Sequence, residues 1–387
     1  MTLSGARLHL GKSDLTLSGE LSDIRRAMLR GGKLKANFEL ESDLIDCNQL
    51  MLAIGKGLQF SDQLASNSVG AFSEDSISVL ETDHLLANTV DSVATDSISQ
   101  LFVVPKFLDL TLHTNAKKID FKDLKLEDVK GEVVIRDQSI NLSDLCMSSN
   151  IGSGDLTMVY TTKTDQEATM GFELSLDDIL VERLISLFPD IDTLVPMLRS
   201  FEGMVDCQMT ATCKADSTMS VLLPSVNASC YLSGKNMVLL DGETFTEISK
   251  TLMFKNKKRN MIDSIAVDLA IHDNKIEVFP FLVEMDRYKV AVGGTHNLDM
   301  TFDYHLSVLK SPVPFKLGID IKGNLDDFKF KIVKCKYKDF LKPAKQAELD
   351  STRRNVREEI RETIRKQIRE AAPELGNSLS EIHPHTH

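Results

Sequence analysis

Alternation of apolar and polar residues is the dominant pattern of this chain. Ile265, Val267, Leu269 and Ile271 alternate with small or polar residues, and residues 300–308 alternate in the same way. A period of two residues is typical of β-strands that have one apolar and one polar face. Because the chain offers few helical segments to cover these apolar faces, something else must cover them, and lipid is one answer.

Shorter runs with the same rhythm fill two blocks, about 103–162 and 203–336, and Asn, Asp or Gly turn residues bound them. A short helix is expected to begin at Asp46 or Asn48, and a capping-box pattern at Ser175 predicts another helix up to Phe188. Such helices are too few to cover a parallel sheet on both faces. The sequence therefore predicts a mainly β fold: an open, twisted and curled antiparallel sheet that forms a hydrophobic groove, with a few short helices and a C-terminal charged helix.

Changes in composition divide the chain into four segments. Residues 1–60 form N-terminal strands and a short helix, and residues 101–340 form the main β domain. Residues 61–100 carry seven acidic side chains and no Lys or Arg, which indicates a flexible insertion. Residues 341–387 form a charged helix and a disordered tail.

The C-terminal helix, predicted over residues 345–370, has one narrow apolar stripe made of Val356, Ile360, Ile364 and Ile368. A stripe one residue wide is narrower than a core-facing helix requires. The pattern favours a solvated helix, with contact to a partner or a membrane surface as the alternatives.

Charge and cysteine content narrow the function classes. The net charge of −12 argues against a nucleic-acid-binding protein, because phosphate neutralisation needs clustered Lys and Arg. The basic run 255–259 lacks stacking aromatic residues and indicates a solvated hairpin tip, with attraction to anionic headgroups as the alternative. The six cysteines include no CxxC motif, so we expect buried thiols. Cys207 or Cys213 with Cys230 is the best candidate for a cross-strand disulfide.

No motif in the sequence predicts catalysis. GxSxG, HExxH, P-loop and strand-linked GxGxxG patterns are all missing, and the internal histidines have no carboxylate or Cys partner at a telling spacing. The alternating histidines of the tail, His383, His385 and His387, are expected to belong to an unstructured end rather than a metal site. We therefore expect a protein that is not an enzyme and that has no cofactor or metal.

The apolar strand faces remain as the candidate site. One interpretation is an ordinary sandwich core, which needs a second layer to dock against. The other is an open, curled sheet whose concave face solvates acyl chains, and the absence of Trp favours such a groove. The candidate lining residues of the groove are Ile265, Val267, Leu269, Ile271, Ile276, Val278, Val290, Val292, Met300, Phe302, Tyr304, Leu306, Phe315, Leu317, Ile319, Ile321, Phe328 and Phe330.

Several segments, in their order along the chain, resemble the C-terminal region of the AsmA-like family (AsmA/TamB type), particularly members from Bacteroidota. In residues 40–50 a strand runs into an aspartate-bearing turn that opens a helix. The other matching segments are Val104-Pro105, Gly131–Leu145, Gly152–Leu156, Phe201–Gly203, Ile271–Phe281, Val290–Thr295 and Leu298–Tyr304. Together the matches extend over nearly all of residues 1–336.

The resemblance implies a non-enzymatic envelope protein of Gram-negative bacteria that binds or conducts phospholipid along a hydrophobic β-groove between the inner and outer membranes. It also implies a periplasmic location, an inner-membrane anchor and envelope protein partners. This sequence shows no signal peptide and no run of about 20 apolar residues, and it opens inside a strand. We therefore expect it to be the C-terminal part of a longer protein. The alternative function is a structural or interaction scaffold with a closed β core and no lipid path.

Overall fold

The protein is mainly β, as the computed structural model shows, with a large, open, mixed sheet, few short helices and a C-terminal helix. This confirms the predicted fold class. The structure describes residues 2–30, 32–50, 53, 101–121, 124–149, 152–187, 201–239, 260–285, 288–297, 301–311, 316–324 and 327–371. The predicted 61–100 insertion, the basic run 255–259 and the histidine tail lie outside the described residues. The chain divides into two compact units.

The first unit contains residues 1–141, 160–168 and 215–220. The β1–β2, β2–β3 and β5–β6 pairs in it are antiparallel. Its elements are β1 (Thr2–Leu10), β2 (Ser13–Ser22), α1 (Ile24–Arg30), β3 (Leu34–Ser42), β4 (Ile45–Asp46), β5 (Leu108–Phe121) and β6 (Leu124–Arg136).

Two strand pairs of the first unit are parallel, in a sheet that the sequence predicted to be mainly antiparallel. β5 runs parallel to β3, with Leu34 beside Leu108, and parallel to β4, with Ile45 beside Ile119. Parallel neighbours need a long crossover connection, and residues 47–107 separate β4 from β5. The long connection therefore lets β5 start at the same end of the sheet as β3.

The turn after β4 confirms one predicted helix start. The Gln49 amide donates a hydrogen bond to the Asp46 carboxylate at 3.0 Å, which is the contact of an N-cap residue, and residues 47–50 are helical. The Asp46 amide in turn donates to the Ser13 hydroxyl at 2.8 Å. Leu40, Ile45 and Ala116 form the apolar core beside this turn.

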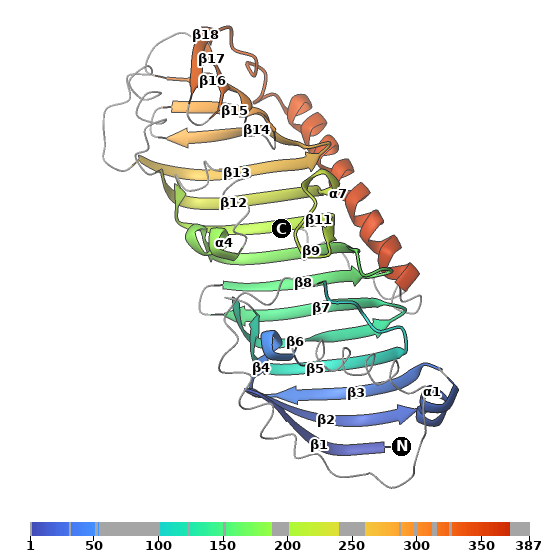
Figure 1. Cartoon of the computed structure of the whole chain (residues 1–387). Helices are drawn as coiled ribbons and strands as arrows, with labels where there is room; N and C mark the ends of the chain where they lie inside the picture. The colour runs from blue at the N-terminus through green and yellow to red at the C-terminus, as the bar shows by residue number, and fades with distance from the viewer. Residues whose placement is uncertain are drawn as a thin grey trace. The chain divides into compact units, whose positions relative to one another are not determined.

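The second unit contains residues 142–159, 169–214 and 221–387. From β11 to β18 each strand pairs antiparallel with the next, and successive strands lie side by side (Figure 1). It holds all or most of β7 (Ser139–Ser149), β8 (Gly152–Thr161), β9 (Glu167–Leu180), α4 (Val181–Leu187), β10 (Phe201–Glu202), β11 (Met204–Asp216), η2 (Leu223–Ser225), β12 (Asn227–Leu239), β13 (Asn260–His272), β14 (Lys275–Met285), β15 (Tyr288–Asn297), β16 (Phe302–Lys310), β17 (Leu317–Gly323), β18 (Phe328–Val333) and α7 (Pro343–Ala371).

The helix predicted to begin at Ser175 begins later. β9 continues to Leu180, and α4 starts at Val181, whose amide donates to the Gly203 carbonyl at 3.0 Å. The capping-box prediction failed because strand geometry buries Leu174 and Leu176 in the core of the unit, and β9 pairs with β11. Burial of these side chains outweighs the local helix-start signal.

Candidate functional site

The predicted lining residues collect on one face of the second unit's sheet, which we call the apolar face. Those on β13 and β14 all belong to one core cluster, in which Ile265, Leu269, Ile271, Ile276 and Val278 are buried and Val267 is half-buried. Those on β15–β17 form a second cluster, in which Val290, Ile319 and Ile321 are buried and Val292, Phe302, Tyr304, Leu306 and Leu317 are half-buried. Phe328 of β18 packs against this second cluster as well.

Strand register makes the apolar face continuous. Leu306 lies between Val292 and Ile319 on the neighbouring strands, and Tyr304 lies opposite Ile321. Tyr304 also packs against both clusters, so it joins them. Burial raises the pKa of Tyr304 to about 12, which indicates a surrounding of low polarity.

Two predicted lining residues cannot be assigned to this face. Met300 and Phe315 lie outside the described residues. Every other predicted lining residue shares the face, because alternate residues of a strand point to the same side.

Exposure along the apolar face increases towards β18. Near β9–β13, α4 contributes Val181 and Leu184 to the core cluster, and both are fully buried. On β18 the side chains of this face are accessible to solvent: Phe330 is 40% exposed and Ile332 is 67% exposed. The apolar face is therefore most accessible at β18.

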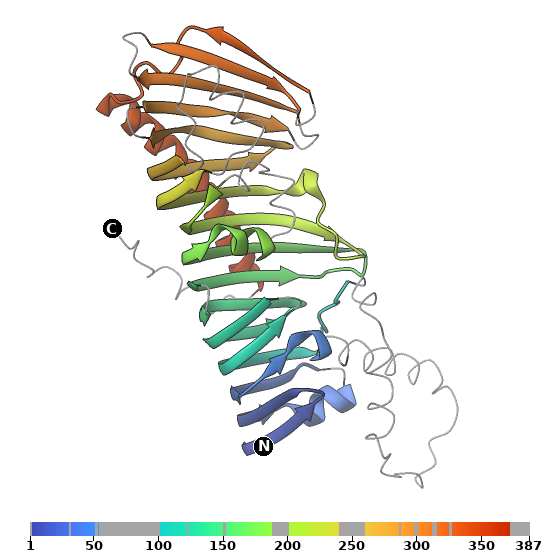
Figure 2. The same ribbon diagram turned by 90° about the vertical axis from the view of Figure 1, so that its left-hand side faces the viewer.

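Helix α7 covers the opposite face, which corrects the prediction of a solvated helix. Ile360, Ile364 and Ile368 are buried against Val159 of β8, with Val356 half-buried beside them. Figure 2 shows α7 crossing behind the strands of the second unit. One narrow stripe is sufficient here because the helix lies across the strands (Figure 1).

Arginines of α7 fix the helix to the sheet beside the isoleucine stripe. Arg353 and Arg357 lie 3.3 and 3.4 Å from the Asp268 carboxylate, and Arg361 pairs with Glu173. Arg353 also donates to the Pro280 carbonyl at 2.8 Å. Burial raises the pKa of Asp268, and this effect exceeds the opposing attraction of the two guanidinium groups. The ion pairs therefore set the position of the helix more than they add net stability.

The polar side of β16 and β17 holds a Ser–His–Asp arrangement that sequence reasoning missed. His305 Nδ1 lies 2.5 Å from Asp320, and His305 Nε2 lies 2.9 Å from the Ser307 hydroxyl. The Lys336 amide donates to Nε2 at 3.1 Å, so Nδ1 carries the proton and donates to Asp320. The usable signal was that His305 and Ser307 share a strand face, with Asp320 directly across from His305 in the next strand.

This arrangement holds the chain after β18 in place. Ser307 has no exposed surface, and its hydroxyl accepts a hydrogen bond from the Tyr337 amide at 3.0 Å. A nucleophile must reach a substrate, and a fully buried hydroxyl with a backbone partner does not. The hydrogen bond from His305 lowers the pKa of Asp320, and Lys336 at 3.0 Å acts in the same direction.

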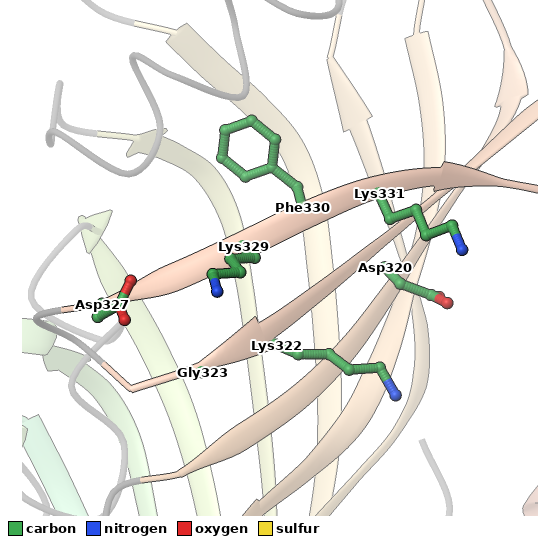
Figure 3. A pocket seen from close by; sticks show the side chains of 7 residues that line it. All are labelled: Asp320, Lys322, Gly323, Asp327, Lys329, Phe330 and Lys331. Atoms are coloured by element: carbon green, nitrogen blue, oxygen red, sulfur yellow. The ribbon is translucent and has the colours of Figure 1, made fainter.

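A hollow lies at β17 and β18, and most of the residues that line it are charged, so it is not the predicted groove (Figure 3). Of the predicted lining residues, Phe330 alone borders it. Its other lining residues are Asp320, Lys322, Gly323, Asp327, Lys329 and Lys331.

All six cysteines are free. Cys207 and Cys230 are buried on the apolar face, as expected for structural thiols, whereas Cys146 is exposed. A hydrogen bond with Cys207 raises the pKa of Cys230 and keeps this thiol protonated.

Within the described ranges, no group of three or more His, Cys, Asp or Glu side chains is placed to hold a metal ion. No described helix has the length and apolar composition that crossing a membrane requires. Comparison with protein-family models, curated proteins and solved structures finds no match.

Proposed function

We propose that this protein binds acyl-chain lipid, and conducts it, along the apolar face of the second unit. The observation that carries the proposal is the continuous apolar surface from β13 to β18, whose side chains become more exposed towards β18. Helix α7 packs against the other face of the sheet, so it does not cover the apolar face.

The mechanism is passive. An acyl chain on the apolar face leaves water at about 0.8 kcal/mol per buried CH₂ group. Because Val, Leu, Ile and Phe line the face with few polar groups, the chain meets similar surroundings at each strand and slides without a deep energy well. Headgroups stay in water at the rim of the apolar face.

This activity is that of a non-enzymatic envelope protein of the AsmA-like type, held by an inner-membrane anchor and carrying phospholipid towards the outer membrane. Two observations support this part of the proposal. Several segments resemble the AsmA-like family in their order along the chain, and the sheet is open. Location, anchor and envelope partners are part of the proposal.

Native mass spectrometry of the purified protein tests lipid binding. We expect phospholipid to co-purify with the unaltered chain, and the half-buried Phe302 and Phe328 to be needed for it. Phe302→Asp or Phe328→Asp puts a charge on the apolar face and should reduce the lipid load at least about tenfold, because burying an unpaired charge is costly.

The matched control is Asp303→Asn, which changes the opposite face of the same strand as Phe302. Its carboxylate pairs with the exposed Lys322 at 2.5 Å, so its loss should leave the lipid load unchanged. Thermal unfolding of each variant shows whether the fold persists. An equal lipid load in folded Phe302→Asp, Phe328→Asp and unaltered protein would overturn the proposal.

A scaffold with a closed core is the second candidate, and one observation favours it. Ile276, Val308 and Ile319 on the apolar face are almost fully buried by their neighbours. In that case the purified protein carries no lipid, and Phe302→Asp and Phe328→Asp lower only the stability of the fold.

A further inference from the structure

The β17–β18 end of the second unit's sheet is positively charged, whereas the chain as a whole is negatively charged. Residues 316–345 contain nine lysines and four aspartates, an excess of five positive charges in a protein whose net charge is −12. Four of these lysines are Lys322, Lys329, Lys331 and Lys336, which lie on or directly after β17 and β18. A local basic surface on an acidic protein indicates an anionic partner.

On the terminal strand β18, apolar side chains lie on one face and basic side chains on the other. Phe328, Phe330 and Ile332 alternate with Lys329 and Lys331, and both lysines are exposed. Figure 3 shows Phe330 leaving the strand on the side opposite Lys331. Phe330 and Ile332 are among the exposed large apolar side chains of the protein.

The charges of Lys329 and Lys331 are not neutralised within the described part of the chain. Lys322 pairs with Asp303, and Lys336 pairs with Asp320. By contrast, no described carboxylate lies within ion-pair distance of Lys329 or Lys331. Lys331 lies opposite Asp320 in the register, but that carboxylate is already engaged by His305 and Lys336.

We propose that the β17–β18 end binds the surface of an anionic phospholipid bilayer. Lys329 and Lys331 contact the phosphates, while Phe330 and Ile332 enter the boundary between headgroups and acyl chains. Long lysine side chains bring an ammonium group to the headgroups while the adjoining apolar residues lie deeper. This inference goes beyond acyl-chain binding on the apolar face, because a protein attaches to a bilayer surface whether or not it removes a lipid from it.

Vesicle co-sedimentation of the full chain tests the proposal. Vesicles of phosphatidylglycerol mixed with phosphatidylcholine should retain the protein, vesicles of phosphatidylcholine alone should not, and added NaCl should release it. Each lysine near an anionic surface contributes about fivefold in affinity. The double variant Lys329→Glu with Lys331→Glu should therefore bind the anionic vesicles at least about tenfold more weakly.

A matched double variant controls for the change in net charge. Lys106→Glu with Lys163→Glu alters two exposed lysines of the first unit by the same four charges and should bind like the unaltered protein. Phe330→Ser with Ile332→Ser should also weaken binding, because it removes the apolar contact.

Equal binding of all three double variants, or equal retention on both vesicle types, would overturn the proposal and leave the lysines a role in solubility alone. The lipid load of the Lys329→Glu, Lys331→Glu variant, whose substitutions lie on the polar face of β18, distinguishes this result from a failure of the proposed function. Loss of vesicle binding with an unchanged lipid load supports a separate attachment surface, and thermal unfolding confirms that each variant is folded.

Discussion

His305 shows at the scale of single residues how pairing across strands creates contacts that spacing along the chain does not reveal. Asp320 lies 15 residues away but directly opposite His305, and the Lys336 amide arrives from beyond the next strand. The spacing of the histidines along the chain gave no sign of this carboxylate partner. The contacts serve packing, since Ser307 is buried and bonded to the backbone of residue 337.

Asp320→Asn tests this network through the pH dependence of stability. The pKa of Asp320 is lower in the folded protein than its usual value of 3.8, so its stabilising effect is full above about pH 3.8 and is lost as pH falls through the lower value. We expect Asp320→Asn to lower the free energy of unfolding by about 1–2 kcal/mol at pH 7. The difference from the unaltered protein should shrink below pH 3.8.

Urea unfolding at a series of pH values measures this difference. Asp273→Asn is the control, because Asp273 is 93% exposed and lies in a turn where Asn is equally accepted. A difference that stays constant down to the lowest pH would contradict the assigned role of the Asp320 carboxylate.

At the scale of elements, α7 shows that one narrow stripe is sufficient to dock a helix across strands. The helix is charged around most of its circumference, yet Ile360, Ile364 and Ile368 are buried. The narrow stripe wrongly predicted a solvated helix, because the expectation of a wider apolar stripe assumes a helix that lies along its neighbour. Gly171 of β9 permits the close approach, since a Cβ atom there would lie 3.2 Å from the Ile364 side chain.

Ile364→Ala distinguishes a docked helix from a solvated one. Removing a buried isoleucine side chain should lower the free energy of unfolding by about 2–4 kcal/mol. On a solvated helix the same change would be neutral or slightly stabilising, because Ala has the higher helix propensity. Urea unfolding measures the effect, and the exposed Thr363→Ala serves as the control.

At the scale of the whole molecule, the sheet of the second unit has one apolar face, although the protein has a net charge of −12. An occupant of that face would be part of the stable state. A ligand that binds only the folded state raises stability according to its concentration relative to its dissociation constant. The lipid proposal therefore has a thermodynamic consequence that does not depend on identifying the lipid.

Delipidated protein should unfold at a lower temperature than protein as purified, and adding phospholipid back should restore the difference. At a free lipid concentration about 100 times the dissociation constant the gain is about 2.7 kcal/mol. Differential scanning calorimetry measures the shift, and Phe302→Asp should abolish it. A delipidated protein that unfolds at the unchanged temperature, with no response to added phospholipid, would contradict lipid occupancy.

Alternation of apolar and polar residues was enough to predict the strands and the parity of their apolar residues, because alternation is a local property of the strand. The sequence therefore predicted the shared face of Ile265, Leu306 and Ile319, and the Asp46 helix cap. The folded chain was needed to show which strands run parallel, how α7 buries its isoleucines and that His305 contacts Asp320. Each of these depends on contacts between residues distant in the chain, and no local pattern encodes such contacts.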